Sequence, residues 1–295
     1  MKQDEWIGLL VLGGIIVLAL MGGSKNAATE FLSPTSSTTE QQKQAQIQQQ
    51  LNDTKAKVAT LQKQLQAELD SKTASKYKGI VTIRNINRST KASQEYVILS
   101  VGKTTDPIDI TGWTLTSTST GQSVAIPQST YLFFANTQNA TQDVLVESGD
   151  TIYISTGISP AGESFKVNKC SGYLAQFQTF YPGLTYNCPL PKNEDLSSIP
   201  ARVANDACFD YINTFPQCRI QTKTLPLNWS YECTNFIYSK INYPSCVDTH
   251  KNDKDFYKHE WRIYLKRSEH IWKTTSRETI VLRDNEGKIV ATYKY

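Results

Sequence analysis

The sequence predicts a mainly β protein whose body is a sandwich of two sheets, preceded by an apolar segment and a helical segment. Short runs rich in β-branched and aromatic residues recur about every ten residues, with polar turns between them, which is typical of a sandwich. No run with helical periodicity interrupts them, so a parallel α/β fold is disfavoured. The expected strands are 80–86, 95–101, 109–116, 123–127, 131–135, 143–146, 151–155, 278–283 and 288–294.

The N-terminal end of the chain predicts a membrane anchor. Residues 1–5 form a polar tail, and the next segment, 6–22, is almost entirely apolar over about 17 residues. At about 1.5 Å per residue this is the short end of what spans a bilayer. A cleaved signal peptide is the alternative, but Asp4 and Glu5 precede the apolar run and no clean cleavage site follows it, so an uncleaved signal anchor is favoured.

A linker and a helical stalk follow the apolar run. Residues 23–39 are small, polar and rich in Ser and Thr, which indicates a flexible linker. Residues 40–76 are rich in Gln, Lys and Ala, and their apolar positions follow a 3-4 heptad spacing: Ile47, Leu51, Val58, Leu61 and Leu65. The segment is either a coiled coil that makes a homo-oligomer or a solitary solvated helix. In both cases it would hold the body off the membrane.

The central pair of predicted strands carries a family resemblance. A strand of the form E-x-V-x-L is followed, after a short loop, by D-I-T-G-W-T-L, with these residues at the matching places: Glu95, Val97, Leu99, Asp109, Ile110, Thr111, Gly112, Trp113 and Leu115. This pattern resembles the signature of the lamin tail domain. The resemblance implies an immunoglobulin-like β-sandwich in which the buried Trp113 anchors the core. It also implies that Glu95, Asp109, Gly112, Trp113 and Gly287 form the family-signature core.

The resemblance extends to two later parts of the chain. A Gly-Asp precedes the expected strand 151–155, and a Ser-Pro-x-Gly turn follows it. The closing hairpin, with its turn at Asp284–Gly287, also resembles the end of a lamin tail domain. The sandwich is therefore expected in two parts, 77–169 and 259–295, with an insertion at 170–258 between them.

The insertion contains all six cysteines of the chain. An even number confined to one region predicts disulfides and an oxidising compartment, whereas a zinc site is disfavoured because no C-x₂-C pair is present. The segment around Phe209 and Ile212 predicts a helix within it. Sequence alone cannot choose among the fifteen ways to pair six cysteines. Because short loops close most readily, local pairing is expected: Cys170–Cys188, Cys208–Cys218 and Cys233–Cys246.

Charge and motifs exclude several function classes. The net charge of +4 is small and dispersed, so nucleic-acid binding is not expected. Nucleophile-elbow, Walker and dinucleotide motifs are absent, and no cofactor is expected. The densest polar cluster could serve a metal hydrolase, but its spacing matches no metal motif and a solvated loop explains it as well: Asp248, His250, Asp253, Asp255, His259 and Glu260.

One group of aromatic residues offers a candidate binding face. Trp261, Tyr264 and Trp272 fit a helical spacing, which favours a stripe facing the core and leaves an exposed binding surface as the alternative. The leading hypothesis is a non-enzymatic cell-surface binding or scaffold protein. It would be anchored once in the membrane, carry its body on the extracytoplasmic side and bind an unknown macromolecule there. The alternative is an extracellular metal-dependent hydrolase that uses the 248–260 cluster.

Overall fold

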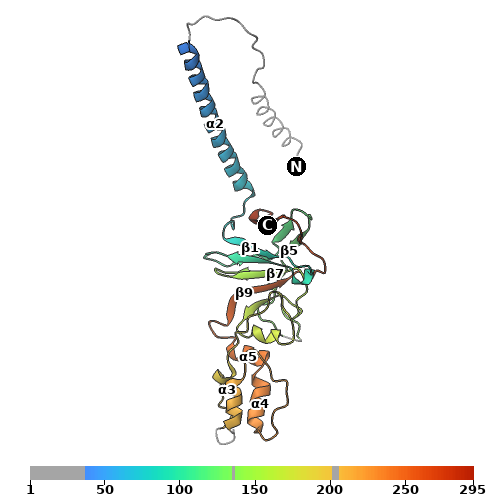
Figure 1. Ribbon diagram of the computed structural model, residues 1–295. Helices are drawn as coiled ribbons and strands as arrows, with labels where there is room; N and C mark the ends of the chain where they lie inside the picture. The colour runs from blue at the N-terminus through green and yellow to red at the C-terminus, as the bar shows by residue number, and fades with distance from the viewer. Residues whose placement is uncertain (1–36, 135–136, 201–205) are drawn as a thin grey trace. The chain divides into compact units, whose positions relative to one another are not determined.

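The computed structural model describes residues 37–134, 137–200 and 206–295, and within them the chain divides into two units after Gln66 (Figure 1). The expected polar tail and membrane anchor, and nearly all of the expected linker, lie outside the described residues. Among the helices that are described, none is long and apolar enough to cross a membrane.

Helix α2 (Ser37–Thr73) occupies the expected stalk. It forms because the segment contains no Gly or Pro and is filled with strong helix formers, chiefly Gln, Lys, Ala and Leu. A single chain leaves its apolar residues open to solvent, with exposed fractions between 43% for Val58 and 65% for Ile47. Packing within this chain therefore does not bury the apolar seam of α2.

The body contains two larger sheets (Figure 1). The first has the order β1-β2-β7-β9-β8, and the second has the order β11-β10-β4-β5. Strands β3 and β6 form a separate pair, and all pairings are antiparallel except β7 with β9. The strands of the first sheet are β1 (Val81–Asn87), β2 (Tyr96–Val101), β7 (Thr151–Ser155), β8 (Phe165–Asn168) and β9 (Tyr257–Tyr264). The remaining strands are β3 (Ile108–Asp109), β4 (Thr114–Ser117), β5 (Ser123–Ala125), β6 (Leu145–Val146), β10 (Thr279–Arg283) and β11 (Ile289–Lys294).

One hydrophobic core lies between the two larger sheets. Alternate residues of β2, including Val97 and Leu99, are fully buried, and they share a cluster with Leu115 of β4 and Leu282 of β10. Period-two burial is what strands show when one face packs on a core. The predicted sandwich-like arrangement is confirmed in this form.

Two of the predicted strands differ from the structure. The run 109–116 is broken after Asp109 because Gly112 adopts a positive φ of 79°, and β4 starts only at Thr114. The run 131–135 forms no strand over its described residues 131–134. Phe133 in that run is buried in a second hydrophobic cluster, which also contains residues of β8 and β9.

The internal strand β9 was not predicted, and the helical spacing assigned to its aromatic residues is wrong. Trp261 and Ile263 belong to the sandwich core, whereas Tyr264 belongs to the second cluster. A strand covered on both faces lacks the alternation of apolar and polar residues that identifies a half-buried strand. This double burial explains why the sequence pattern did not indicate a strand.

The insertion leaves and re-enters the sandwich at neighbouring strands. Asn168 of β8 lies opposite Tyr257 of β9, so the two ends of the insertion are close together. Between them lie η2 (Ser171–Ala175), η3 (Pro191–Asn193), α3 (Asp206–Thr214), α4 (Tyr231–Lys240) and α5 (Tyr243–His250). Ser230 and Asn242 cap α4 and α5 by accepting hydrogen bonds from backbone N–H groups. The second hydrophobic cluster unites this segment with the outer face of β8 and β9.

All six cysteines form disulfides, but the local pairing predicted for them is wrong. The bridges are Cys170–Cys246, Cys188–Cys218 and Cys208–Cys233, which span 76, 30 and 25 residues. Helix packing brings two of these pairs together, because α5 contacts η2 and α3 lies beside α4 (Figure 1), whereas Cys188 and Cys218 lie outside the helices. Loop-closure entropy grows only slowly with loop length, so it does not outweigh the packing.

Candidate functional site

Residues 109–112, which carry the resemblance to the lamin tail signature, form a turn that packs against another turn of the second sheet. The Asp109 carboxylate accepts a hydrogen bond from Thr111 N at 2.9 Å, which closes the turn. Gly112 is required there, since its φ is positive and an added Cβ would lie 2.8 Å from Asn285 Oδ1. Asn285 in turn donates to the Thr111 carbonyl at 2.9 Å. The signature thus joins the turn before β4 to the β10–β11 turn.

Two of the signature residues are buried, and three are not. Trp113 is 1% exposed and packs its ring 5.2 Å from that of Tyr77. Glu95 is fully buried. Asp109, at the end of β3, and Gly112 and Gly287, in turns, are exposed. Asp109 acts through its carboxylate, whereas the two glycines act through backbone geometry, with positive φ angles of 79° at Gly112 and 76° at Gly287.

Glu95 is held by three donors from distant parts of the chain. Its carboxylate accepts hydrogen bonds from Thr156 Oγ1 at 2.7 Å and from Ile271 N at 3.0 Å. His270 Nδ1 lies 2.8 Å from the other carboxylate oxygen. Because every close partner is a protein group, this buried acid fastens the 265–272 segment to the start of β2.

The candidate aromatic binding face is not exposed. Trp261, Tyr264 and Trp272 are 0%, 3% and 2% exposed, so the expectation that they face the core is confirmed and the binding-face alternative is wrong. Trp261 makes an edge contact with Tyr131 at 4.8 Å, and its Nε1 donates to Asp150 at 3.3 Å. Burial raises the pKa of the Tyr264 hydroxyl to about 12.

The polar cluster 248–260 does not converge on one point. His259 contacts Asp150 at 2.9 Å, and Glu260 contacts Arg262 at 2.6 Å. Asp248 pairs with Lys251 at 3.2 Å. Within the part of the chain that the structure describes, no group of three or more His, Cys, Asp or Glu side chains could hold a metal ion.

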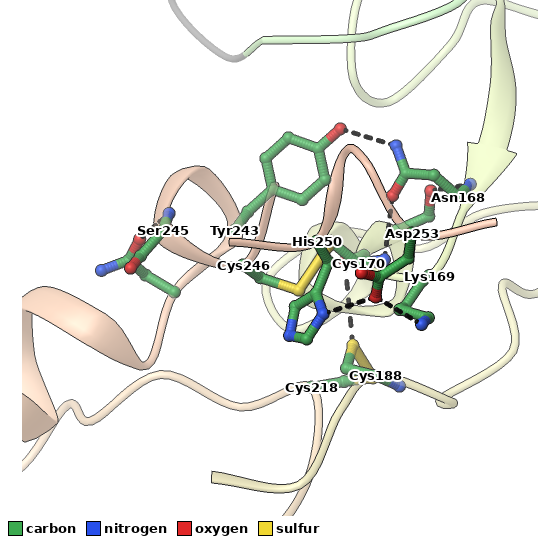
Figure 2. Close-up of a disulfide and its surroundings, with 12 residues drawn as sticks. Asn168, Lys169, Cys170, Cys188, Cys218, Tyr243, Ser245, Cys246, His250 and Asp253 are labelled. Atoms are coloured by element: carbon green, nitrogen blue, oxygen red, sulfur yellow. Dashed lines mark hydrogen bonds and ion pairs between the residues drawn. A yellow bond between two sulfur atoms is a disulfide. The ribbon is translucent and has the colours of Figure 1, made fainter. Parts of the chain in front are cut away.

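Three residues of that cluster join Lys169 and Glu194 in a group of ion pairs at the base of the insertion. This charged clamp comprises Lys169, Glu194, His250, Asp253 and Asp255. Lys169 Nζ lies 2.8 Å from Asp253 and 2.6 Å from Asp255. His250 lies between Asp253 at 2.8 Å and Glu194 at 3.0 Å. Figure 2 shows His250, Asp253 and Lys169 beside the Cys170–Cys246 disulfide.

The clamp shifts the ionisation of its members toward their charged forms. Burial lowers the pKa of His250, but hydrogen bonds to Glu194 and Asp253 outweigh burial and the pKa is raised above 6.5. The hydrogen bond from Lys169 holds the pKa of Asp253 below its usual value, and Asp253 in turn raises the pKa of Lys169. These groups stabilise one another, which suits a structural clamp better than a catalytic acid and base.

A cleft beside β5 was missed by the sequence analysis. It has a volume of about 490 Å³ and lies between β5, the Glu163–Ser164 turn and the segment after β9. Its charged lining residues are Glu163, Lys266 and Arg267. The signal in the sequence was the basic run Arg262–Arg267, but only the pairing of β9 inside the sheet shows which of its members reach this cleft.

No protein-family model matches the chain, and no curated protein matches it.

Proposed function

We propose that this chain is a non-enzymatic cell-surface binding or scaffold protein with a lamin-tail-like immunoglobulin-fold body. The observation that carries the proposal is the set of three disulfides, whose sulfur-bearing residues are at most 5% exposed. Buried structural disulfides form and persist in oxidising compartments. The body therefore belongs on the extracytoplasmic side, and residues 6–22 supply the single membrane anchor.

The signature residues support the lamin-tail-like fold. Asp109 and Gly112 build the turn that receives Asn285, and Trp113 fills the core beside it. Each residue of the motif thus has a physical reason for its identity within a two-sheet body. Since sandwiches of this kind host many roles, the fold alone does not name a ligand.

The state of the polar cluster supports a binder over a hydrolase. A metal-dependent hydrolase needs several ligands that converge on one ion with an open position. Here Asp253 and Asp255 are both bound by Lys169, and His259 is bound by Asp150. The side chains that a metal ion would need as ligands are therefore engaged in ion pairs within the protein.

The stalk is the proposed site of self-association, as a parallel and in-register coiled coil. Its core positions are Ile47, Leu51, Val58, Leu61 and Leu65, and they are all exposed in the single chain. Thr54 interrupts this seam, but its hydroxyl is satisfied by the Gln50 carbonyl at 2.7 Å. Parallel pairing sets Lys55 against Gln50, and Lys57 against Gln62, of the second copy. The antiparallel alignment that matches the same seam would set Lys55 beside Lys55 and Lys57 beside Lys57, which like-charge repulsion disfavours.

Protease treatment of intact cells tests the proposed location. An epitope placed after Tyr295 should be lost when protease is added outside the cells, while a cytoplasmic marker protein survives. Maleimide labelling after denaturation without reductant should leave all six cysteines unmodified. An epitope that is digested only after lysis, together with free thiols, would place the body in the cytoplasm and refute the proposal.

A further inference from the structure

Strand β5 forms one wall of the cleft and presents an open edge. It is the last strand of the second sheet and has a neighbour only on the β4 side. The bonds Ser117 N to Gln122 O at 2.9 Å and Ile126 N to Trp113 O at 2.8 Å fix which residues face β4. Along a strand, the backbone N–H and C=O groups of successive residues point to opposite sides. Since those of Gln122 and Ile126 point toward β4, those of Ser123 and Ala125 point away from β4.

The opposite wall carries a guanidinium that lacks a carboxylate partner among the described residues. Arg267 Nη2 lies 3.4 Å from Gln122 Oε1, and its Nε is buried without a hydrogen-bond partner. The neighbouring Lys266 is already engaged by Glu163 at 3.5 Å. A buried donor without an acceptor destabilises the fold, so a ligand acceptor that binds Arg267 would relieve that cost.

Pro127 and Leu265 add apolar surface to the cleft, whereas Val124 belongs to the sandwich core. The cleft volume of about 490 Å³ falls within the ~300–1,000 Å³ typical of ligand sites. An open strand edge, some apolar surface and a cation without a carboxylate partner among the described residues are together elements that suit recognition of an extended peptide by strand addition.

We propose that the cleft binds an extended peptide segment that pairs with the β5 edge and places an acidic side chain on Arg267. Ser123 and Ala125 supply the backbone hydrogen bonds, and the guanidinium supplies a charge-assisted pair with a carboxylate. Since β5 has only three residues, it can form few backbone hydrogen bonds with a peptide. The charge pair with Arg267 therefore decides which peptides bind. Glu163, which also lines the cleft and pairs with Lys266, disfavours a second acidic residue beside it.

The proposal rests on the proposed function, because it names the kind of partner that a surface binding protein would take. Its test uses the purified full-length chain in detergent, so its result does not depend on where the body lies in the cell. The probe is Thr-Val-Glu-Val-Thr-amide with fluorescein on its N-terminal amine, and binding is followed by fluorescence anisotropy. Saturable binding is expected, and peptides with Lys in place of Glu or with N-methylated alternate amides should bind at least about tenfold more weakly.

Variants of the protein separate the charge from the fold. Arg267→Gln should weaken binding of the Glu peptide by about tenfold or more, and Arg267→Glu should restore binding of the Lys peptide. Lys103→Gln, an exposed basic residue outside the cleft, should bind like the unchanged chain. An unchanged melting temperature and disulfide map show that a variant has folded.

Three outcomes would overturn the proposal. The first is that the unchanged chain shows no saturable binding of the Glu peptide. The second is equal binding of the N-methylated peptide, which would exclude pairing with the β5 edge. The third is full competition by free acetate at the same concentration as peptide, which would leave a simple carboxylate site in place of a peptide site.

Discussion

Removal of the Cys170–Cys246 disulfide should loosen the insertion and leave the sandwich folded. Cys170 directly precedes η2 and Cys246 lies within α5, so the bridge fastens the last helix of the insertion to its first turn. The change is Cys170→Ala with Cys246→Ala, because alanine leaves no unpaired thiol and no buried hydroxyl. The hydrogen-bonded sandwich strands β10 and β11 do not contain either residue.

The size of the effect follows from the length of chain that the bridge closes. A loop of 76 residues corresponds to about 4.5 kcal/mol in the chain-entropy model. The other two bridges remain and shorten the path between the two cysteines, which reduces the figure to about 4 kcal/mol. Removal of Cys208–Cys233, which spans 25 residues, should cost about 3.5 kcal/mol and should act mainly on α3 and α4.

Hydrogen exchange read by mass spectrometry measures both the size and the place of the loss. Amides of α5 should lose protection equivalent to about 4 kcal/mol, while those of β10 and β11 keep theirs. The Cys208→Ala, Cys233→Ala chain is the matched control, with its loss centred on α3 and α4. A cost below about 1 kcal/mol would refute the loop-entropy reasoning. Equal loss in α5 and β10 would show that insertion and sandwich unfold as one unit.

Three further changes test the clamp, the core and the stalk. The raised pKa of His250 means that its stabilising contribution is complete below pH 6.5 and is lost as pH rises through the folded-state pKa, so His250→Gln should lower the melting temperature more at about pH 5.5 than at about pH 8. An equal decrease in melting temperature at both pH values would show that the ion pairs of His250 are not its cause. Trp113→Ala should cost about 3–5 kcal/mol in denaturant unfolding because the side chain is 1% exposed, and a cost near that of a surface change would contradict its role as core anchor. Leu51→Lys with Leu65→Lys should reduce the mass found by sedimentation in detergent, whereas a monomeric unchanged chain would leave α2 as a solitary stalk.

The sequence by itself determined the local elements whose residue pattern has a single physical explanation. Runs rich in β-branched and aromatic residues at 95–101 and 151–155 predict strands, and β2 and β7 lie there. The heptad run predicts a helix, and α2 covers it. The even cysteine count predicts disulfides, and all six residues are paired. For the strands and the helix the deciding information lies within a few neighbouring residues, and for the disulfides it lies in the number of cysteines.

Only the tertiary structure decided which distant segments meet. The disulfide partners depend on α5 packing against η2, which no spacing of cysteines records. Pattern analysis does not detect strand β9, because both of its faces are covered. For the same reason the sequence did not decide whether Trp261 is buried or exposed. The cleft combines the edge of β5 with Arg267, more than a hundred residues later, so neither segment alone indicates a site. Contacts between segments far apart in the chain depend on packing of the whole body, and local sequence preferences do not encode them.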